Sequence, residues 1–443
     1  MKDSNLLVKN ARIIDPSTGI EKTGDILIAE GQISKIGKDI SKTGVTAIDA
    51  SGLIACPGFV DLHCHLRQPG YEDKETIATG AAAAAHGGYT TICCMPNTNP
   101  PLDNAAVVSH VRDIAAREAP FITILPVGCI TGGRAGRELA DMTELAGAGC
   151  VGFSDDGSPV SNARIMSLAM QNAAVLDLPI IDHCEDLDLS AGGHMHDGWV
   201  AVRLGLKGIP AAAEETMVAR DIALCELTGA RLHATHISTR GSVELVRNAK
   251  QRGLKVTCDV TPHNLTLTHE QVMKATADPR TALTYDTNAR VNPPLRSSAD
   301  IDALIQGIMD GTIDAIATDH APHTIEEKLC EFENALSGII GFETAFGVLM
   351  ALVHTGRISL NTLLLCLTTG PARVLKSAAG TLIPGARADL ALLDTEREWT
   401  VDVKDFLSKG RNTPYDGCKL KGMVVATISG GRLSYRHNSL RIS

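Results

Sequence analysis

Two histidines separated by one residue give the clearest metal-binding signal in this sequence. His63 and His65 follow an apolar run over residues 53–60, and this run predicts a buried strand. Side chains alternate between the two faces of a strand, so both imidazoles point the same way and can reach one metal ion. Cys64, between them, is expected to face away and to serve only in packing. A ligand pair at the carboxyl end of a buried strand indicates an α/β barrel, which keeps its chemistry at that end.

Most of the other predicted strands also end in residues that can bind a metal. The candidates are Asp155 or Asp156 after the fourth strand, Asp182 or His183 after the fifth, His233 or His236 after the sixth, and Asp319 after the eighth. Pleat alternation lets one member of each pair face the barrel axis, and the place nearer the strand end favours His236. Histidine and carboxylate ligands suit zinc or a similar divalent ion. Six ligands exceed what one catalytic zinc needs, whereas two ions bridged by a carboxylate would use them all.

Asp61 and several further histidines do not lie at the carboxyl end of a predicted barrel strand. Asp61 shares a face with the first pair one layer deeper, where orienting a ligand histidine and a buried structural hydrogen bond are equally good interpretations. His194 and His196 repeat the spacing but lie among glycines, which predicts a loop with no metal role. Four further histidines lie in helical or terminal stretches and are interpreted as ordinary core or surface residues: His86, His110, His354 and His437.

The elements that must position these ligands follow an alternating pattern. Eight apolar runs end near His65, Asn97, Cys129, Asp156, His183, His236, His263 and Asp319. Helical patterns lie between them, over residues 76–86, 104–117, 162–176, 211–227, 242–251 and 299–309. Eight strand–helix repeats predict an α/β fold, a (β/α)8 TIM barrel over residues 57–375.

Both ends of the chain have a different pattern. Short strands separated by turn residues are predicted over 6–8, 11–14, 25–28 and 32–36, and again over 388–393 and 422–428, with a hairpin turn at Gly430 and Gly431. Residues 1–56 and 376–443 are therefore expected to form one small composite β domain.

Composition narrows the class of function. The chain has 443 residues, 44% of them hydrophobic, and a net charge of −10, which argues against nucleic acid and anionic membranes as partners. The N-terminal residues show no apolar signal core, and no stretch approaches a membrane span. Twelve cysteines without a CxxC pair fit reduced thiols, so a cytoplasmic protein is expected.

Several motifs resemble those of a known family. Residues 57–65 and 318–323 resemble the amidohydrolase superfamily. The segments 65–70 (HLRQPG), 95–98 (MPNT), 152–157 (GFSDDG), 236–239 (HIST) and 292–296 (NPPLR) resemble the dihydroorotases of the long bacterial class (class I). The resemblance implies a zinc-dependent hydrolase that opens dihydroorotate reversibly to N-carbamoyl-L-aspartate in pyrimidine (UMP) biosynthesis.

The resemblance also assigns roles to residues. It implies two zinc ions per subunit, held by His63, His65, Asp156, His183, His236 and Asp319, with Asp319 also the catalytic acid and base. Asp156, rather than Asp155, is implied as the ligand between the ions. The related dihydropyrimidinases (hydantoinases) and allantoinases, the alternative function, bridge their metals with a carboxylated lysine from strand four, and this chain has none there.

The same resemblance implies the substrate contacts. His65, Arg67, Asn97, Asn292 and His323 would bind a substrate carboxylate or ring amide, together with Ser337 and Gly338. The family often has Pro-Phe-Gly where this chain has Leu336-Ser337-Gly338, and backbone contacts survive such changes. A homodimer and a complex with aspartate transcarbamoylase are further expectations. A second alternative, a non-catalytic scaffold for that partner, is disfavoured because every expected ligand is present.

Overall fold

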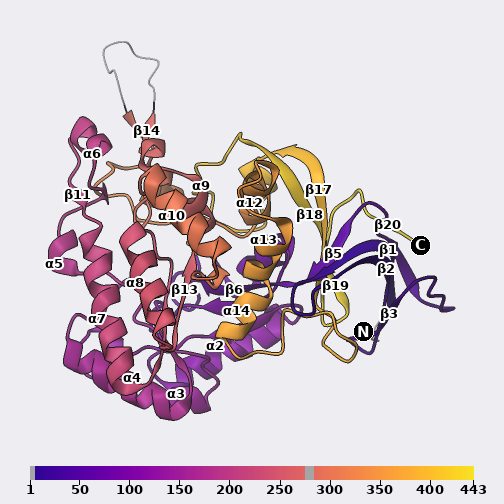
Figure 1. The fold of residues 1–443 in the computed structure, drawn as a ribbon, viewed down its shortest axis with the longest axis horizontal. Helices are drawn as coiled ribbons and strands as arrows, with labels where there is room; N and C mark the ends of the chain where they lie inside the picture. The colour runs from indigo at the N-terminus through magenta and orange to yellow at the C-terminus, as the bar shows by residue number, and fades with distance from the viewer. Residues whose placement is uncertain (1–4, 275–283) are drawn as a thin grey trace.

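The computed structural model describes residues 5–274 and 284–443; Met1–Ser4, part of the predicted N-terminal region without a signal core, lie outside them. Parallel strands form a closed barrel with helices outside it, and a separate β sheet lies to one side (Figure 1). The predicted TIM barrel with a small β domain built from both chain ends is confirmed.

The barrel strands appear in chain order around the barrel. β6 (Phe59–Cys64), β7 (Tyr89–Cys94) and β8 (Thr123–Pro126) pair in one run, and β9 (Pro179–Asp182), β12 (Arg231–Ala234), β13 (Val256–Val260) and β16 (Ala315–Ile316) in another. Phe153 bridges Gly128 and Ile180 and so supplies the short fourth strand. A bridge between Cys64 and His320 closes the ring.

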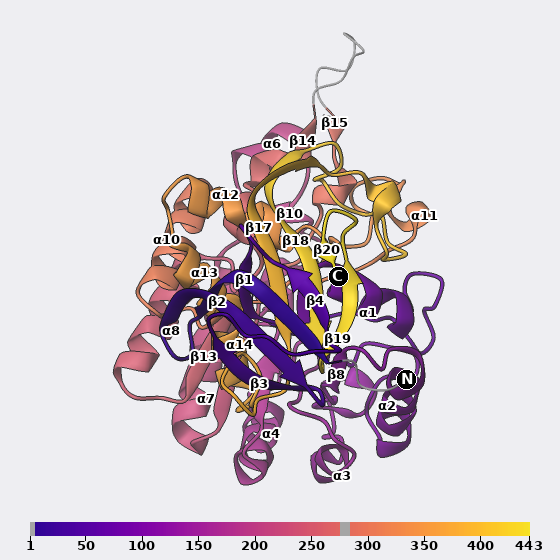
Figure 2. The ribbon, with the colours of Figure 1, turned by 90° about the vertical axis from the view of Figure 1, so that its right-hand side faces the viewer.

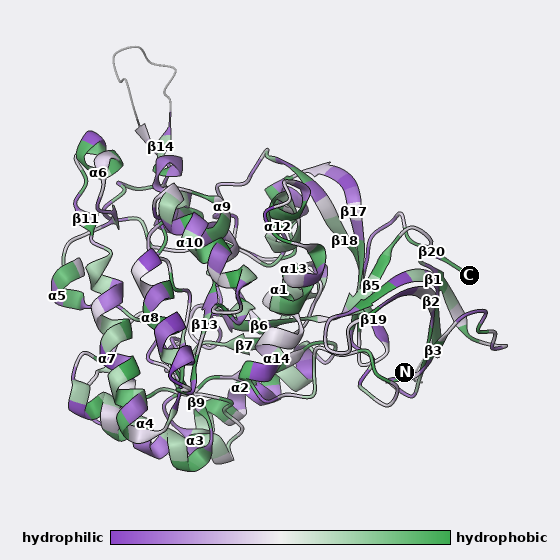
Figure 3. Ribbon diagram, viewed as in Figure 1, coloured by the Kyte–Doolittle hydropathy of each residue, from purple (hydrophilic) through white to green (hydrophobic). Residues whose placement is uncertain are grey.

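The predicted helices lie within one to two residues of their observed positions. They are α1 (Ile77–His86), α2 (Ala105–Glu118), α4 (Ala163–Leu176), α7 (Ala212–Thr228), α8 (Arg240–Gln251) and α10 (Ser298–Met309). Polar side chains cap several of them and so fix where they begin; Thr76, for example, forms a capping box at the start of α1. The outer helix α8 alternates between hydrophobic and hydrophilic residues, as expected for one buried face (Figure 3).

Other elements extend the carboxyl end of the barrel or complete its helical layer. The helices are α3 (Met142–Gly147), α5 (Leu187–Ser190), α6 (Trp199–Leu204), α9 (Pro262–Thr266), α11 (Ile325–Lys328), α12 (Ala345–His354), α13 (Leu360–Leu367) and α14 (Thr369–Val374). Short 3-10 turns are η1 (Gly132–Arg134), η2 (His269–Val272), η3 (Thr287–Ala289) and η4 (Val403–Asp405). Two small strand pairs join β10 (Met195–His196) to β11 (Gly208–Ile209) and β14 (Met273–Lys274) to β15 (Thr284–Tyr285).

The β domain interleaves the two ends of the chain, which both lie on its side of the molecule (Figure 2). Its strands run in the order β19-β18-β17-β5-β1-β2-β3, with β4 between β1 and β20. Their bounds are β1 (Leu6–Asp15), β2 (Ile20–Ala29), β3 (Gln32–Gly37), β4 (Thr46–Asp49), β5 (Ile54–Pro57), β17 (Leu390–Thr400), β18 (Lys419–Ser429), β19 (Arg432–Arg436) and β20 (Arg441–Ile442). The turn predicted at Gly430 and Gly431 joins β18 to β19.

Two local predictions were wrong, and one strand ends slightly before the expected position. Residues 6–8 and 11–14 form one strand, β1, with a bulge at Asn10, whose φ of 62° and N–H bond to Asp25 break the register. The strand expected to end near His263 ends at Val260, because Thr261 caps a new helix with Pro262 in its first turn. His196 lies in the short strand β10 rather than in a loop.

Candidate metal and substrate site

Six side chains converge at the carboxyl end of the barrel. His63 belongs to β6 and His65 follows it, Asp156 follows the short fourth strand, and His183, His236 and Asp319 follow β9, β12 and β16. All six residues are at least nine-tenths buried. Parallel strands bring their carboxyl ends to one rim, so residues far apart in sequence form a single cluster.

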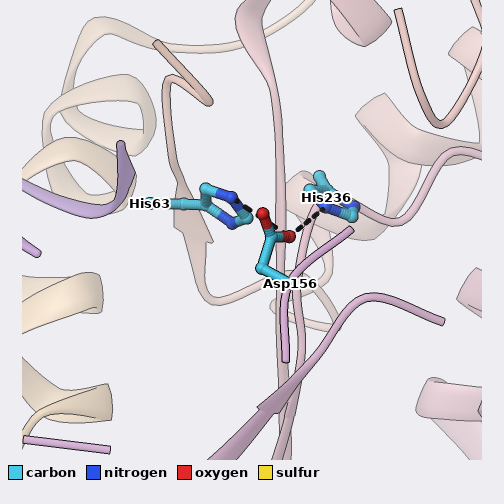
Figure 4. Close-up of side chains that lie close together, drawn as sticks. All are labelled: His63, Asp156 and His236. Carbon is cyan, nitrogen blue, oxygen red and sulfur yellow. Dashed lines mark ion pairs between the residues drawn. The ribbon is translucent and has the colours of Figure 1, made fainter. Parts of the chain in front are cut away.

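Asp156 occupies the middle of this cluster. Its Oδ1 atom lies 3.4 Å from His63 Nε2, 3.6 Å from His183 Nδ1 and 3.7 Å from His236 Nε2, while its Oδ2 atom lies 3.7 Å from His65 Nε2. Figure 4 shows the carboxylate between the His63 and His236 rings. One carboxylate therefore faces all four imidazoles.

Asp319 closes the other side of the cluster. Its Oδ1 atom lies 3.0 Å from His65 Nε2 and 3.5 Å from His63 Nε2. The ligand atoms of His63, His65 and Asp319 lie within 4.8 Å of one another, and so do those of His63, Asp156 and His236. The geometry thus offers two overlapping sets of ligands.

The ring of His63 is prepared for a cation. Its Nδ1 atom lies 2.8 Å from Thr235 Oγ1, which turns Nε2 toward the two carboxylates. That Nε2 atom is buried and has no hydrogen-bond partner among the described residues. A buried polar atom without a partner is costly, and a metal ion would satisfy it. The residues present therefore fit a metal of the zinc type.

Electrostatics within the cluster favour bound positive charge. Burial by itself would raise the pKa of Asp156, but the charge of His63 and the neighbouring rings of His183 and His236 lower the pKa well below its usual value. Burial likewise opposes ionisation of His63, yet the neighbouring Asp156 raises the pKa of His63 to about 9. The carboxylates stay ionised and the imidazole holds a proton, which a divalent cation can displace.

Three residues of the site have strained backbones. Arg67, His236 and Asp319 have φ angles of 61°, 39° and 46°, a region that residues other than glycine seldom adopt. Buried carboxylates hold two of these turns: Asp259 accepts a 2.6 Å bond from His236 N, and Asp61 accepts bonds of 2.8 and 2.6 Å from Thr318. Strain of this kind concentrates where function dictates the conformation.

The structure separates the paired candidates. Asp155 accepts bonds from the main chain of Ile130 and Thr131 and from the Thr131 hydroxyl, away from the histidines. His233 binds Thr257 and Asp259 below the cluster. Asp182 lies beside Asp221, Cys184 and Arg220, where the guanidinium already supplies positive charge.

Asp61 and the remaining histidines have other partners. The Asp61 side chain bonds to Thr318, which supports the interpretation as a structural hydrogen bond. His196 Nδ1 lies 3.3 Å from Arg296 Nη1, and His194 Nδ1 lies 3.3 Å from Arg290 Nη2. Neither belongs to a group of potential metal ligands in residues 5–274 and 284–443.

The predicted substrate residues surround the cluster. Asn97 Oδ1 lies 2.9 Å from His65 Nδ1, and its amide nitrogen lies 3.4 Å from Asp156 Oδ2. Asn292 lies on the opposite side, where it donates a 2.8 Å bond to Glu185. A hollow on that side is lined by His183, Glu185, His236, Asn292 and Arg296 among others.

Arg67 and His323 form a second group. The Arg67 Nε atom donates to Pro322 O at 3.1 Å, and its Nη2 atom lies 3.4 Å from His323 Nε2. His323 Nε2 also lies 2.8 Å from Ser337 O. Gly338, at φ 148°, packs so closely that a Cβ would lie 2.9 Å from His323 Nε2. A cation, an imidazole and a glycine-containing turn thus stand together beside Asp319.

Sequence reasoning missed two acidic residues of the site. Asp259 joins His233, Thr235 and the backbone of His236, and so ties β13 to the end of β12. Glu185 lies 3.0 Å from His183 Nε2. Glu185 could have been found because it lies two residues after the candidate ligand His183. Asp259 could have been found because it is an aspartate inside the apolar run of β13.

Comparisons with known proteins agree with this geometry. The dihydro-orotase-like family matches residues 52–242. A dihydroorotase from Pelotomaculum thermopropionicum is 49% identical over 98% of this chain and 100% of its own, and one from a Geobacter species is 48% identical over 98% and 99%. A solved L-hydantoinase (dihydropyrimidinase) from Arthrobacter aurescens, 25% identical, superposes with a TM-score of 0.85 over 99% of this chain and 97% of its own.

Within the described part of the chain, no helix is long and apolar enough to span a membrane.

Proposed function

Since this chain belongs to the dihydroorotase family, we propose that it catalyses the reversible hydrolysis of (S)-dihydroorotate to N-carbamoyl-L-aspartate, a step of pyrimidine (UMP) biosynthesis. The observation that carries the proposal is the convergence of four histidines and two carboxylates at the barrel rim, with Arg67 and His323 beside them. A cyclic amide that bears a carboxylate needs both features: hydrolytic metal chemistry and a local cation in an acidic protein.

We assign the metal as zinc, with two ions per subunit. His63, His65 and Asp319 would hold one ion and His183 and His236 the other, with Asp156 between them. The zinc ions would lower the pKa of the attacking water and polarise the ring carbonyl. An aspartate at the end of strand four, with no lysine there, distinguishes this site from those of hydantoinases and allantoinases.

Asp319 is the residue that we assign to proton transfer. Burial raises its pKa, but the hydrogen bond from His65 and the charge of His63 lower the pKa below its usual value, so the carboxylate is ionised and can accept a proton. It would take the proton from the attacking water and deliver it to the leaving ring nitrogen. In the ring-closing direction the same carboxylate would take the proton from the amide.

Substrate binding is assigned to the groups around the cluster. Arg67 would bind the substrate carboxylate through two parallel hydrogen bonds, with Asn97 and His323 completing this clamp. Asn292 would hold the ring amide edge, His65 would contact the substrate as well as the metal, and Ser337 and Gly338 would contribute through their backbone. This assignment gives a partly buried cation beside the cluster a role in a protein of net charge −10.

Replacement of Arg67 by methionine is expected to raise KM for dihydroorotate about 10- to 100-fold, because a charge-assisted contact to the substrate carboxylate is lost. The value of kcat should change much less, since Arg67 is not assigned to proton transfer. Steady-state kinetics in the hydrolytic direction measures both values. Arg117→Met, on the exposed face of α2, is the control, and an unchanged KM in Arg67→Met would remove the clamp from the proposal.

The assigned substrate is tested by comparing three cyclic amides. Purified, zinc-loaded protein is assayed in parallel on dihydroorotate, dihydrouracil and allantoin. We expect turnover of dihydroorotate and little of the other two, which lack its carboxylate. Turnover confined to dihydrouracil or allantoin would instead identify a hydantoinase or an allantoinase.

Localisation, oligomeric state and partner proteins are also part of the proposal. We propose a cytoplasmic homodimer that acts on a small molecule and can assemble with aspartate transcarbamoylase. A scaffold without activity would not require a complete set of ligands, and all six stand together here.

A further inference from the structure

A loop from the C-terminal part of the chain reaches the rim of the barrel. Residues 406–412, here termed the C-terminal strap, lie between η4 and β18, and Figure 2 shows the yellow loop between β17 and β18 extending toward α11. Leu407 N and Ser408 N donate to the carboxylate of Glu343 at 2.7 and 3.2 Å. Ser408 Oγ and Lys409 N donate to Glu75, whose side chain is fully buried just before α1. Two buried carboxylates of the barrel therefore anchor the strap.

The strap is also fixed by its own residues. The Arg411 guanidinium donates to the carbonyls of Phe406, Ser408 and Gly410, so it closes the loop upon itself. Gly410 lies against the barrel: a Cβ there would be 2.6 Å from Ile340 Cγ2 and 2.8 Å from Pro322 Cβ. Such close approach needs glycine and brings the strap against the segment that follows Asp319.

Asn412 ends the strap with a fully used side chain. Its Oδ1 atom accepts a 3.0 Å bond from His323 N, and its Nδ2 atom donates to Ala321 O at 2.9 Å and Gly338 O at 3.0 Å. The residue is 3% exposed. One amide thus joins two main-chain segments, residues 321–323 and 337–338, that are separated in the sequence.

These two segments carry the proposed carboxylate clamp. Pro322 O, between two residues held by Asn412, receives the Nε–H of Arg67, and His323 Nε2 lies 2.8 Å from Ser337 O. Gly338 O is held a second time, by the buried ammonium of Lys328, which also donates to Leu336 O at 2.7 Å. The orientation of Arg67 and His323 therefore depends on main chain that the strap fixes.

We propose that Asn412 is a positioning residue for substrate binding: through residues 321–323 and 337–338 it holds Arg67 and His323 in the geometry that receives the substrate carboxylate. This inference rests on the proposed dihydroorotase function for the identity of the ligand. The hydrogen bonds of the Asn412 side chain go to His323, Ala321 and Gly338, and none of these is among the six proposed metal ligands. Its role is therefore separable from metal binding.

The test compares three zinc-loaded variants with the unaltered protein. Asn412→Ala removes all three bonds. Asn412→Asp keeps the size of the side chain and the acceptor for His323 N but places a buried carboxyl group against Ala321 O and Gly338 O. The circular dichroism spectrum and thermal unfolding of both variants identify any folding defect. Thr427→Val is the matched control, because it removes another buried bond from the C-terminal part, to Ala85 O of α1, away from the clamp. Each protein is measured for zinc content, KM and kcat, and the rate of tryptic cleavage after Lys409 and Arg411.

Both Asn412 variants are expected to raise KM for dihydroorotate about tenfold, with kcat within about threefold and zinc content unchanged. Cleavage within the strap should become faster in these variants and stay slow in Thr427→Val. An unchanged KM, or a loss of zinc or kcat at constant KM, would overturn the proposal.

Failure of the proposed function has a different signature. If the unaltered protein does not turn over dihydroorotate, the function proposed above is wrong, whatever the variants do. Cleavage rates then test the anchoring step of the inference: equal rates in all variants overturn it, and faster cleavage in both Asn412 variants supports the anchoring of the strap by Asn412.

Discussion

Asp319→Asn is expected to reduce kcat for dihydroorotate by about 10³-fold or more while the protein keeps its fold and its circular dichroism spectrum. The amide has the shape of the carboxylate but cannot accept a proton from water, and it is a poorer metal ligand. Asp319 Oδ1 lies 3.0 Å from His65 Nε2 and 3.5 Å from His63 Nε2. The substitution therefore removes both the proposed proton acceptor and a proposed metal ligand. Hydrolysis of dihydroorotate, followed by loss of the ring absorbance, measures the effect.

The matched control is an aspartate at the opposite end of the same strand. Asp314 precedes β16 and pairs with Lys250 and the backbone of Cys258 at the bottom of the barrel. Asp314→Asn should lower stability slightly and leave kcat near that of the unaltered protein. Comparable kcat values for Asp319→Asn and Asp314→Asn would contradict the assigned proton transfer.

Asp156→Asn is expected to release at least one of the two proposed zinc ions and to reduce kcat at least about 10²-fold, since even residues that merely support metal ligands contribute 10- to 100-fold to metal affinity. Asp156 is the carboxylate that faces all four histidines. Atomic absorption of protein dialysed against metal-free buffer measures the zinc content directly.

Asp155→Asn provides the neighbouring control. Its side chain accepts bonds from Ile130 and Thr131 and points away from the histidines, so this variant should keep its zinc. Release of zinc from Asp155→Asn but not from Asp156→Asn would reverse the assignment of the two residues.

Local features that the sequence encodes directly were predicted well. Helix starts coincide with side chains that cap them, such as Thr76, Asn104, Asn162, Thr239 and Ser297, and these residue types are visible in the sequence. The alternation of a strand was enough to place His63 and His65 together. Proximity to the strand end was likewise enough to favour His236 over His233.

Features that depend on contacts between distant segments were not predicted. Asp259 matters because β13 lies beside β12, and the bulge in β1 depends on Asp25 of the next strand. Nothing in the composition of residues 406–412 indicates that they lie against residues more than sixty positions earlier. Whether Asp61 orients a ligand histidine or makes a structural hydrogen bond depends on Thr318, which is far from it in the sequence and whose hydroxyl donates to Asp61 Oδ2 at 2.6 Å.

The interleaving of the two chain ends bears on the order in which the molecule can be completed during synthesis. β5, which leads directly into the first barrel strand, lies between β1 and β17. While the ribosome makes the barrel, β5 therefore keeps one edge open, with the hydrogen-bonding groups of residues 54–57 unpaired until residues 390–393 emerge. The barrel strands can pair as they appear, whereas the β domain is closed by segments that are translated after the barrel. A nascent chain stalled before β17 would thus expose a strand edge to other nascent chains.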